Sequence, residues 1–348
     1  MSKRLAYVDV ARAFAVLCVI AGHTFSAHGL VHDFCFTFEL PLFFFTSGYF
    51  TSEEKRLTND YVRRSLQSIM LPYLVTCLIL ILLAAARAAL FHSEVFAQNV
   101  TRWIMASLYG SGDVSERWPL MYVPSIGAIW FLPALFFVRI LLVALNKLEK
   151  SWLKALSVVG IFVAGYTSVS LIWLPMSVQP AMVSLPFAYV GQLFRKYDLL
   201  NQDGRMPKWV WPLAFICFAL CVRFGGHLYL NAVRFNDGIL LDLLGGIAGT
   251  LSVLKLSEWL CVKSEERLRD VEFVGKSTLA VFCMHLVDLY MGLYSLALLV
   301  PDLTTNSGVK FLYRVTAAAF LCLIMWAIPA LRRVYFPHAA ALSIARSE

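Results

Sequence analysis

The chain has 348 residues, of which 59% are hydrophobic and 15% are charged, and its formal net charge is +8. A soluble domain carries about 25% charged residues, so this composition excludes a water-soluble globular protein and predicts an integral membrane protein. The positive charges are spread over the connections between apolar segments, which gives no reason to expect nucleic acid as a partner. We expect a single membrane domain over residues 1–348 without a soluble appendage.

Ten apolar segments are candidates for membrane-spanning helices, which need about 20 mostly apolar residues each. They cover residues 7–28, 34–51, 68–90, 126–145, 155–173, 180–194, 210–224, 239–260, 278–300 and 311–335. The sixth and seventh are short, which is compatible with tilted or re-entrant helices. The sequence therefore predicts an all-α polytopic membrane protein with about ten transmembrane helices.

Lysine and arginine residues are distributed unevenly between alternate connections. If the N-terminus is cytoplasmic, the inner connections hold roughly three times as many of them as the outer ones. Positive charges accumulate on the cytoplasmic side, so this bias favours an even number of spans with both termini in the cytoplasm. The longest connection, residues 92–125, then lies outside, and we expect a helix within it near residues 99–108.

The first apolar segment carries three ionisable residues, Asp9, Arg12 and His23. Such groups are costly inside a bilayer and usually mark a functional site. Arg12 and His23 are eleven residues apart, so at ~100° per residue they share one helix face and lie ~16 Å apart along the axis. One face would carry a permanent cation near one membrane surface and a titratable base near the other. This layout suits chemistry that joins the two sides of a bilayer.

Four further motifs follow along the chain. The second segment contains Glu39 and the run Pro41-Leu-Phe-Phe-Phe-Thr-Ser47-Gly48, and the third follows the basic pair Arg63-Arg64. The fourth segment begins with Gly127-Ala-Ile-Trp130-Phe-Leu-Pro133-Ala-Leu-Phe. The ninth reads Gly275-Lys-Ser-Thr-Leu-Ala-Val-Phe-Cys-Met-His285, with Asp288 three residues later.

Together with Gly22-His23-Thr24 and in this order, these motifs resemble the acyltransferase 3 family, and most closely its branch of enzymes similar to fucose 4-O-acetylases. The resemblance extends from residue 5 to about residue 290. It implies ten helices around an acyl-donor tunnel in the bacterial inner membrane. It also implies acyl-CoA, most simply acetyl-CoA, as a cytoplasmic co-substrate without a permanently bound cofactor. The implied acceptor is a sugar hydroxyl of a surface glycan or of its lipid-linked precursor.

The resemblance also implies roles for individual residues. We expect His23 to be the general base, because an imidazole titrates near neutral pH and can take the proton of a sugar hydroxyl. Transfer through an acyl-histidine is the alternative. Arg12 is expected to hold part of the donor while Asp9 fixes its rotamer. The predicted set comprises His23, Arg12 and Asp9 for catalysis, Arg63, Arg64, Ser47 and Gly48 for donor binding, and Glu39, Trp130, His285 and Asp288 for the acceptor site or tunnel lining.

Each assignment competes with a simpler structural role. His23 could be solvated at the outer interface, and Arg12 could extend to the inner head groups while Asp9 neutralises it. The positive-inside bias alone accounts for Arg63 and Arg64. Ser47-Gly48 could provide a close helix contact, Trp130 an interfacial anchor, and the pair of His285 and Asp288 inter-helix hydrogen bonding.

The sequence offers no metal or disulfide motif. The eight cysteines lie in or near apolar segments and form no CxxC pair, so we interpret them as small apolar residues. His28 and His32 have a spacing that suits a metal, but no third ligand is evident beyond Asp33. We interpret both histidines as polar residues of an outer loop.

A secondary transporter is the rival function from another class, because helices broken near Pro41, Pro133 and Pro186 could form a substrate site at the midplane. No inverted repeat is visible, and the charge constellation is concentrated in the first third of the chain. A succinyltransferase of the same fold is the closer alternative, since tunnel width or one additional cation would select the larger acyl group. The acceptor hydroxyl and the oligomeric state remain open at the level of sequence.

Overall fold

A computed structural model describes residues 5–26, 29–91, 94–113, 123–200, 206–225, 228–236, 238–264, 268–292 and 306–337. The chain divides into two compact units. Unit 1 comprises Met1–Lys55, Pro186–Tyr229 and Arg234–Phe282, and unit 2 comprises Arg56–Leu185, Leu230–Val233 and Cys283–Glu348. Each unit is therefore built from segments that are far apart in the sequence.

Unit 1 is a helical bundle with one short β-hairpin. Its helices are α1 (Ala6–Gly22), α2 (Leu30–Tyr49), the second half of α8 (Val178–Lys196), α9 (Val210–Phe224), α10 (Ile239–Ser264), α11 (Arg269–Lys276) and the start of α12 (Thr278–Val287). The hairpin pairs β1 (Leu228–Tyr229) with β2 (Arg234–Phe235) in antiparallel register, so that Leu228 faces Phe235.

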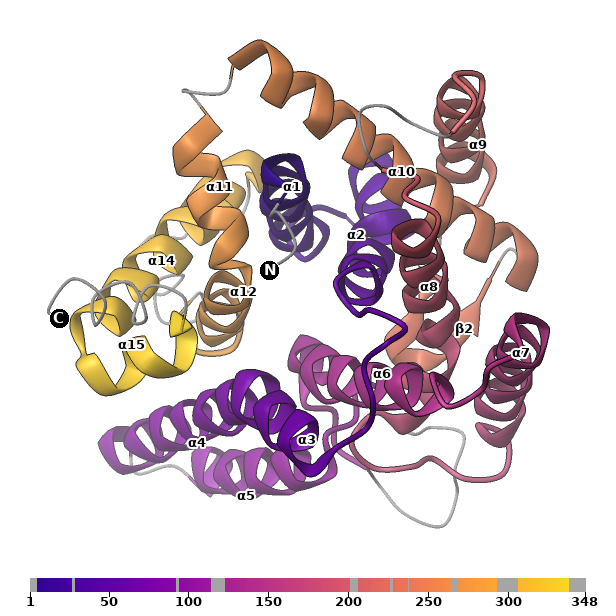
Figure 1. The fold of residues 1–348 in the computed structure, drawn as a ribbon. Helices are drawn as coiled ribbons and strands as arrows, with labels where there is room; N and C mark the ends of the chain where they lie inside the picture. Colours follow the sequence, from indigo (N-terminus) through magenta and orange to yellow (C-terminus); the bar gives the residue numbers. More distant parts are fainter. Residues whose placement is uncertain are drawn as a thin grey trace, which may run out of the picture. The chain divides into compact units, whose positions relative to one another are not determined.

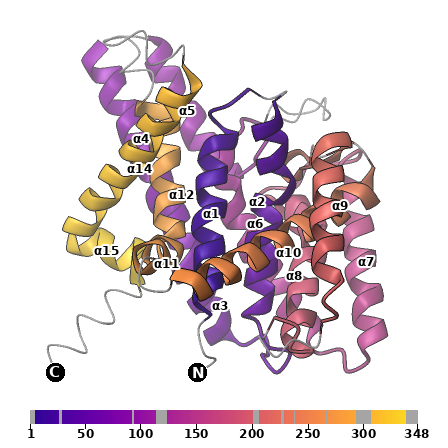
Figure 2. The same ribbon diagram turned by 90° about the horizontal axis from the view of Figure 1, so that it is seen from above.

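Helix α1 packs against three other helices of unit 1, namely α2, α10 and α11 (Figures 1 and 2). Most of its residues are buried, and many of them are small, including Ala11, Ala13 and Ala15. Small side chains allow helices in a membrane to approach closely, where van der Waals packing holds them together. The sequence of α1 thus suits a helix that is surrounded on several sides.

Helices α2 and α8 cross with backbones in contact. A Cβ atom added at Gly48 would collide with the carbonyl oxygen of Ala188, and one added at Gly191 would collide with the carbonyl oxygen of Phe45. The crossing is extended by a hydrogen bond from Gln192 Nε2 to the carbonyl oxygen of Thr51, 2.9 Å long. Glycine is required at both contact points because any side chain would separate the two helices.

Unit 2 contains the remaining helices. They are α3 (Asn59–Ser65), η1 (Leu66–Met70), α4 (Leu71–Phe91), α5 (Glu94–Tyr109), η2 (Gly127–Trp130), α6 (Phe131–Leu145), α7 (Ser151–Ser168), the first half of α8, η3 (Leu230–Ala232), η5 (Asp288–Gly292), α14 (Ser307–Ala327) and α15 (Pro329–Tyr335). Helix α4 packs along α5 and also contacts η5 and α15, while α6 packs against η1. Tyr73 and Thr76 on α4 are fully buried, and the Thr76 hydroxyl lies 2.9 Å from that of Tyr335.

The structure confirms a helical membrane protein. Within the described residues, four helices are long and apolar enough to cross a membrane, namely Asn59–Leu90, Gly127–Leu145, Ile239–Lys263 and Ser307–Ala327. A fifth span is possible if Asp270–Lys276 and Thr278–Tyr290 form one crossing that is bent by 73°. Every segment predicted from the sequence overlaps a helix, but the number of ten spans and the cytoplasmic termini stay predictions.

Some predicted bounds differ from the observed ones. The segment 7–28 is helical only to Gly22, and the segment 311–335 is divided at Ile328 into α14 and α15. Pro329 causes that division, because it has no backbone N–H to continue α14 but suits the first turn of a new helix. The helix predicted near 99–108 is confirmed as α5. Residues 114–122 and 293–300 lie outside the described residues.

The α2–α8 crossing predicts a packing defect in Gly191→Ala. The added methyl group must push the two backbones apart, which should cost roughly 1–3 kcal/mol. We expect a lower melting temperature for the purified protein in detergent. Gly160→Ala on α7 is the matched control, because a Cβ there meets nothing within 4 Å. It should melt at or slightly above the wild-type temperature. Equal melting of Gly191→Ala and wild type would contradict the close crossing.

Candidate active site

Helix α1 is uninterrupted from Ala6 to Gly22, and His23 caps its C-terminal end. The regular helix places Arg12 and His23 on one face, ~16 Å apart along the axis, as the sequence predicted. Arg12 lies in the first half of α1 and keeps a quarter of its side-chain surface exposed, while His23 is half-buried at the opposite end. The two groups therefore lie on one largely buried helix, with Arg12 before its midpoint and His23 at its C-terminal end.

Arg12 is held from two sides. Its Nη1 atom lies 3.7 Å from Oδ1 of Asp9, one turn earlier on α1, and its Nη2 atom donates a 3.1 Å hydrogen bond to Oγ1 of Thr278, the first residue of α12. Asp9 is 2% exposed, so its charge is tolerated only with a partner. A planar guanidinium can engage two partners at once in a fixed geometry, which a lysine cannot.

A close backbone contact fixes the position of Thr278. A Cβ atom added at Gly275 on α11 would collide with the carbonyl oxygen of Asp9. Glycine thus lets α11 touch α1 directly beside the Asp9–Arg12 pair. The chain then bends at Ser277, which is the C-cap of α11, and presents Thr278 to Arg12. Sequence analysis noted this Gly275-to-Thr278 motif but missed the contact of Thr278 with Arg12.

His23 borders an aromatic cluster at the end of α1. Its ring meets Phe36 edge-on at 6.0 Å, and Phe36 stacks on His32 with ring centroids 4.1 Å apart. The ring centroid of Tyr229, on β1, lies 5.6 Å from that of Phe36 and 6.2 Å from that of His32. Asp33 lies next to this group, with its Oδ1 atom 3.5 Å from Nδ1 of His32. We call His23, His32, Phe36 and Tyr229 the aromatic cluster.

The structure revises the interpretation of His32 as a polar residue of an outer loop. His32 lies in the first turn of α2, where it is buried against Phe36 and paired with Asp33. The signal in the sequence was its position, since a histidine next to an aspartate at a span boundary is a candidate pair. His28, its predicted companion, lies outside the described residues.

Three predicted residues lie on α2. Glu39 is buried, faces α1 near Cys18, and its Oε2 atom has no hydrogen-bond partner in the described part of the chain. A buried carboxyl oxygen without a partner is costly and suggests a site rather than simple packing. Ser47 is half-buried, while Gly48 is occupied by its contact with α8. Donor binding by Ser47 and Gly48 stays a prediction.

The basic pair on α3 lies at the surface of unit 2. Arg64 forms a 2.7 Å ion pair with Asp60, and both side chains are more than half exposed. Arg63, the neighbouring residue, is exposed as well. An exposed ion pair contributes little to stability. The contact with Asp60 therefore does not by itself explain why two arginines stand at positions 63 and 64.

Trp130 and Asp288 also belong to unit 2. Trp130 is buried in η2 and packs against Gly112, which leaves it no simple role as an interfacial anchor. Asp288 is buried at the start of η5, close to Tyr313 and Arg314 on α14. His285 is fully buried one turn earlier on α12. Sequence analysis did not single out Arg314, although an intramembrane cation opposite an aspartate is a recognisable signal.

The predicted site residues thus fall into two groups. Asp9, Arg12, His23, Glu39, Ser47 and Gly48 lie in unit 1, whereas Arg63, Arg64, Trp130, His285 and Asp288 lie in unit 2. Within the described ranges, no group of three or more histidine, cysteine, aspartate or glutamate side chains is arranged to hold a metal ion. The acyl-donor tunnel stays a prediction.

A sequence model described as an acyltransferase domain matches residues 5–333, nearly the whole chain. The chain belongs to the acyltransferase 3 family. No curated protein and no solved structure matches it. The family and the apolar helices together establish a membrane acyltransferase. The resemblance to the branch of fucose 4-O-acetylases stays a prediction.

The two-sided hold on Arg12 predicts a graded response in this acyltransferase. Arg12→Lys keeps the charge but cannot span Asp9 and Thr278, so acyl transfer per folded molecule should fall nearly as far as in Arg12→Ala. Thr278→Val removes one charged hydrogen bond, which corresponds to roughly a tenfold loss. Thr278→Ser keeps the hydroxyl and should retain activity. A fully active Arg12→Lys would show that only the charge at this position matters.

Proposed function

We propose that the protein is a transmembrane O-acyltransferase of the bacterial inner membrane. It takes an acyl group, most simply acetyl, from cytoplasmic acyl-CoA and delivers it to a sugar hydroxyl of a surface glycan or its lipid-linked precursor. Both termini lie in the cytoplasm. The observation that carries the proposal is the single helix α1, which holds Asp9 and Arg12 in its first half and His23 at its C-terminal end.

The proposed reaction needs one base and one well-positioned thioester. A ring nitrogen of His23 takes the proton of the acceptor hydroxyl as the sugar oxygen attacks the thioester carbon. The carbon–sulfur bond breaks, and the CoA thiolate leaves and receives the proton from the histidinium. Arg12, fixed by Asp9 and Thr278, orients the donor. Correct positioning of two reactants removes much of the barrier to a bimolecular step.

Unit 2 supplies the proposed donor entrance. Arg63 and Arg64 are exposed at the start of the long helical stretch Asn59–Leu90, where the predicted topology places the cytoplasmic surface. Arginine recognises phosphate groups through paired N–H donors. We therefore assign the phosphates of CoA to this pair, and we assign Trp130, His285 and Asp288 to the lining of the tunnel.

The aromatic cluster is the proposed acceptor platform. Aromatic rings present apolar faces beside polar edges, which suits a sugar that must be held by its ring while one hydroxyl points at His23. Phe36 lies beside both His23 and His32, and Tyr229 lies beside Phe36 and His32. Release of free CoA from acetyl-CoA by the purified protein separates this enzyme from a carrier, and a mass shift of the glycan by one acetyl or one succinyl group identifies the donor.

His23→Ala is predicted to abolish transfer while expression and membrane insertion persist. Removing a general base typically costs 10²–10⁴-fold in rate. Acylated glycan is measured by mass spectrometry and normalised to folded protein. Ser26→Ala is the matched control, because Ser26 is an exposed residue three positions after His23 that is not part of the aromatic cluster. Transfer at a near-wild-type rate in His23→Ala would reject the assignment of the base.

Replacing Arg63 and Arg64 together with alanine is predicted to raise the KM for acyl-CoA. The remaining donor affinity should depend less on salt, because charge–charge contacts with the phosphates are screened by ions. The matched control replaces Lys147 and Lys150, two exposed lysines of unit 2 that share the predicted cytoplasmic side. If both double variants keep the wild-type KM, the arginines serve only to orient the chain in the membrane.

A further inference from the structure

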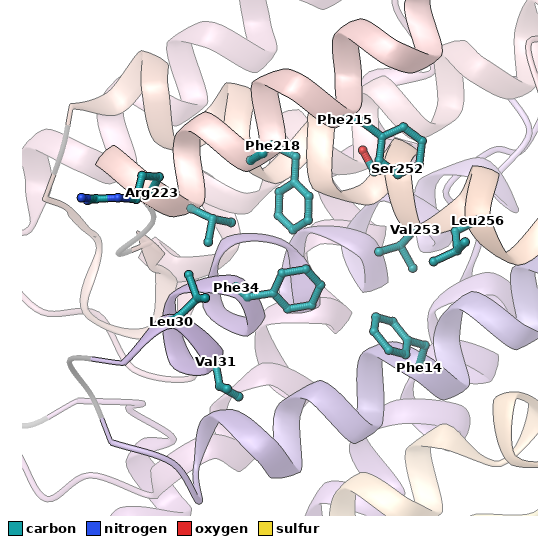
Figure 3. Close-up of a pocket in the computed structure, with 12 residues that line it drawn as sticks. Phe14, Leu30, Val31, Phe34, Phe215, Phe218, Arg223, Ser252, Val253 and Leu256 are labelled. Carbon is teal, nitrogen blue, oxygen red and sulfur yellow. The ribbon is translucent and has the colours of Figure 1, made fainter.

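An apolar cavity of about 530 Å³ lies within unit 1, between α1, α2, α9 and α10 (Figure 3). We call it the lipid groove. Its lining residues are Phe14, Leu30, Val31, Phe34, Phe215, Phe218, Ala219, Val222, Arg223, Ser252, Val253 and Leu256. The volume is within the usual range of small-molecule sites, about 300–1,000 Å³. The catalytic proposal uses none of these residues, so the groove requires its own explanation.

The groove is polar at one end only. Arg223 is exposed in the last turn of α9, beside Leu30, and Figure 3 shows its side chain at that end of the cavity. No acidic partner of Arg223 lies in ion-pair distance among the described residues. The one hydroxyl in the lining, that of Ser252, already donates to the carbonyl oxygen of Ala248 at 2.8 Å. The groove thus combines a purely apolar channel with one available cation.

The dimensions of the groove fit a hydrocarbon chain within one leaflet. Phe215 and Arg223, at its two ends on α9, are eight residues apart, which is ~12 Å along the helix. The hydrocarbon half of a bilayer is ~15 Å deep. A chain lying in the groove would therefore place its head group at the level of Arg223.

The head-group end of the groove is also the His23 end of α1. Leu30 begins α2 shortly after His23 ends α1, and Phe34 packs on Phe218 of α9 at 5.2 Å. On α1 itself, Phe14 and His23 are nine residues apart, so they point to opposite faces, ~180° apart. A lipid chain and the acyl donor would then occupy different sides of α1, and only the head group would reach over its end toward His23.

We propose that the lipid groove binds the hydrocarbon chain of a lipid phosphate that carries the acceptor sugar, with Arg223 holding the phosphate. This inference rests on the proposed acyl transfer and selects the lipid-linked form of the acceptor over a finished glycan. Arg223 lies over the ring of Phe224, 5.3 Å from its centroid, and has no carboxylate within ion-pair distance among the described residues. Charge complementarity favours an anionic lipid, because the phosphate of a zwitterionic lipid is already neutralised by its own ammonium group, whereas a lipid phosphate without such a group keeps its charge for the guanidinium. A cationic side chain at the membrane surface attracts anionic head groups in the same way.

The test measures binding of a fluorescent polyprenyl monophosphate to the purified full-length protein in nanodiscs of zwitterionic lipid. Ala219→Trp fills the groove and should weaken binding at least tenfold. Leu220→Trp is the matched control, because the adjacent residue on α9 is exposed but does not line the groove. Arg223→Gln should weaken binding severalfold and abolish its salt dependence. Arg223→Lys keeps the positive charge and should retain most of the affinity and most of the salt dependence.

Two comparisons distinguish a specific lipid site from ordinary contact with bulk lipid. One compares the two tryptophan variants, and the other compares the polyprenyl phosphate with a neutral polyprenol. Equal binding by Ala219→Trp and Leu220→Trp, or equal binding of a neutral polyprenol and its phosphate, would reduce the groove to ordinary contact with bulk lipid and overturn the proposal. Release of CoA with a water-soluble sugar acceptor is measured in parallel and should be unchanged in Ala219→Trp. A failure of the His23→Ala prediction would leave the binding result intact, so the two proposals fail separately.

Discussion

The Asp9–Arg12 pair imposes the main physical constraint on unit 1, because two charges must be kept inside an apolar bundle. Burial of either charge alone would be prohibitive, and burial of the pair is favourable only with further hydrogen bonds. Thr278 supplies one of them, which requires that α12 begin beside α1. That requirement in turn explains why Gly275 has no side chain, since α11 must touch the backbone of Asp9.

Close contacts between helices hold the Asp9–Arg12 pair in place, although the hydrophobic effect contributes little to helix association in a membrane. In a membrane the lipid tails are as apolar as the side chains, so helices associate through packing and hydrogen bonds. Glycines at the α2–α8 crossing and beside Asp9 bring backbones together at two places in unit 1. The same rigidity holds His23 in a fixed position at the end of α1, which a general base requires.

Helix α1 also separates two kinds of chemistry. Its Arg12–His23 face carries the ionisable groups, while the opposite face contributes Phe14 to the lipid groove. A polar reaction and a hydrocarbon chain can therefore be accommodated side by side without sharing a wall. In the proposed enzyme this arrangement keeps the lipid of the acceptor away from the acyl donor, and it brings only the sugar to His23.

The sequence by itself determined the membrane class, the helical segments, the shared face of Arg12 and His23, and the family, because each depends on composition or on spacing along one helix. It could not determine that Thr278 binds Arg12, that His32 stacks on Phe36, or that Asp288 lies with Tyr313 and Arg314. Those contacts join helices far apart in the chain, and helical periodicity says which face a residue occupies but not which helix lies opposite. The lipid groove likewise arises only where four helices meet, so tertiary packing alone decided it.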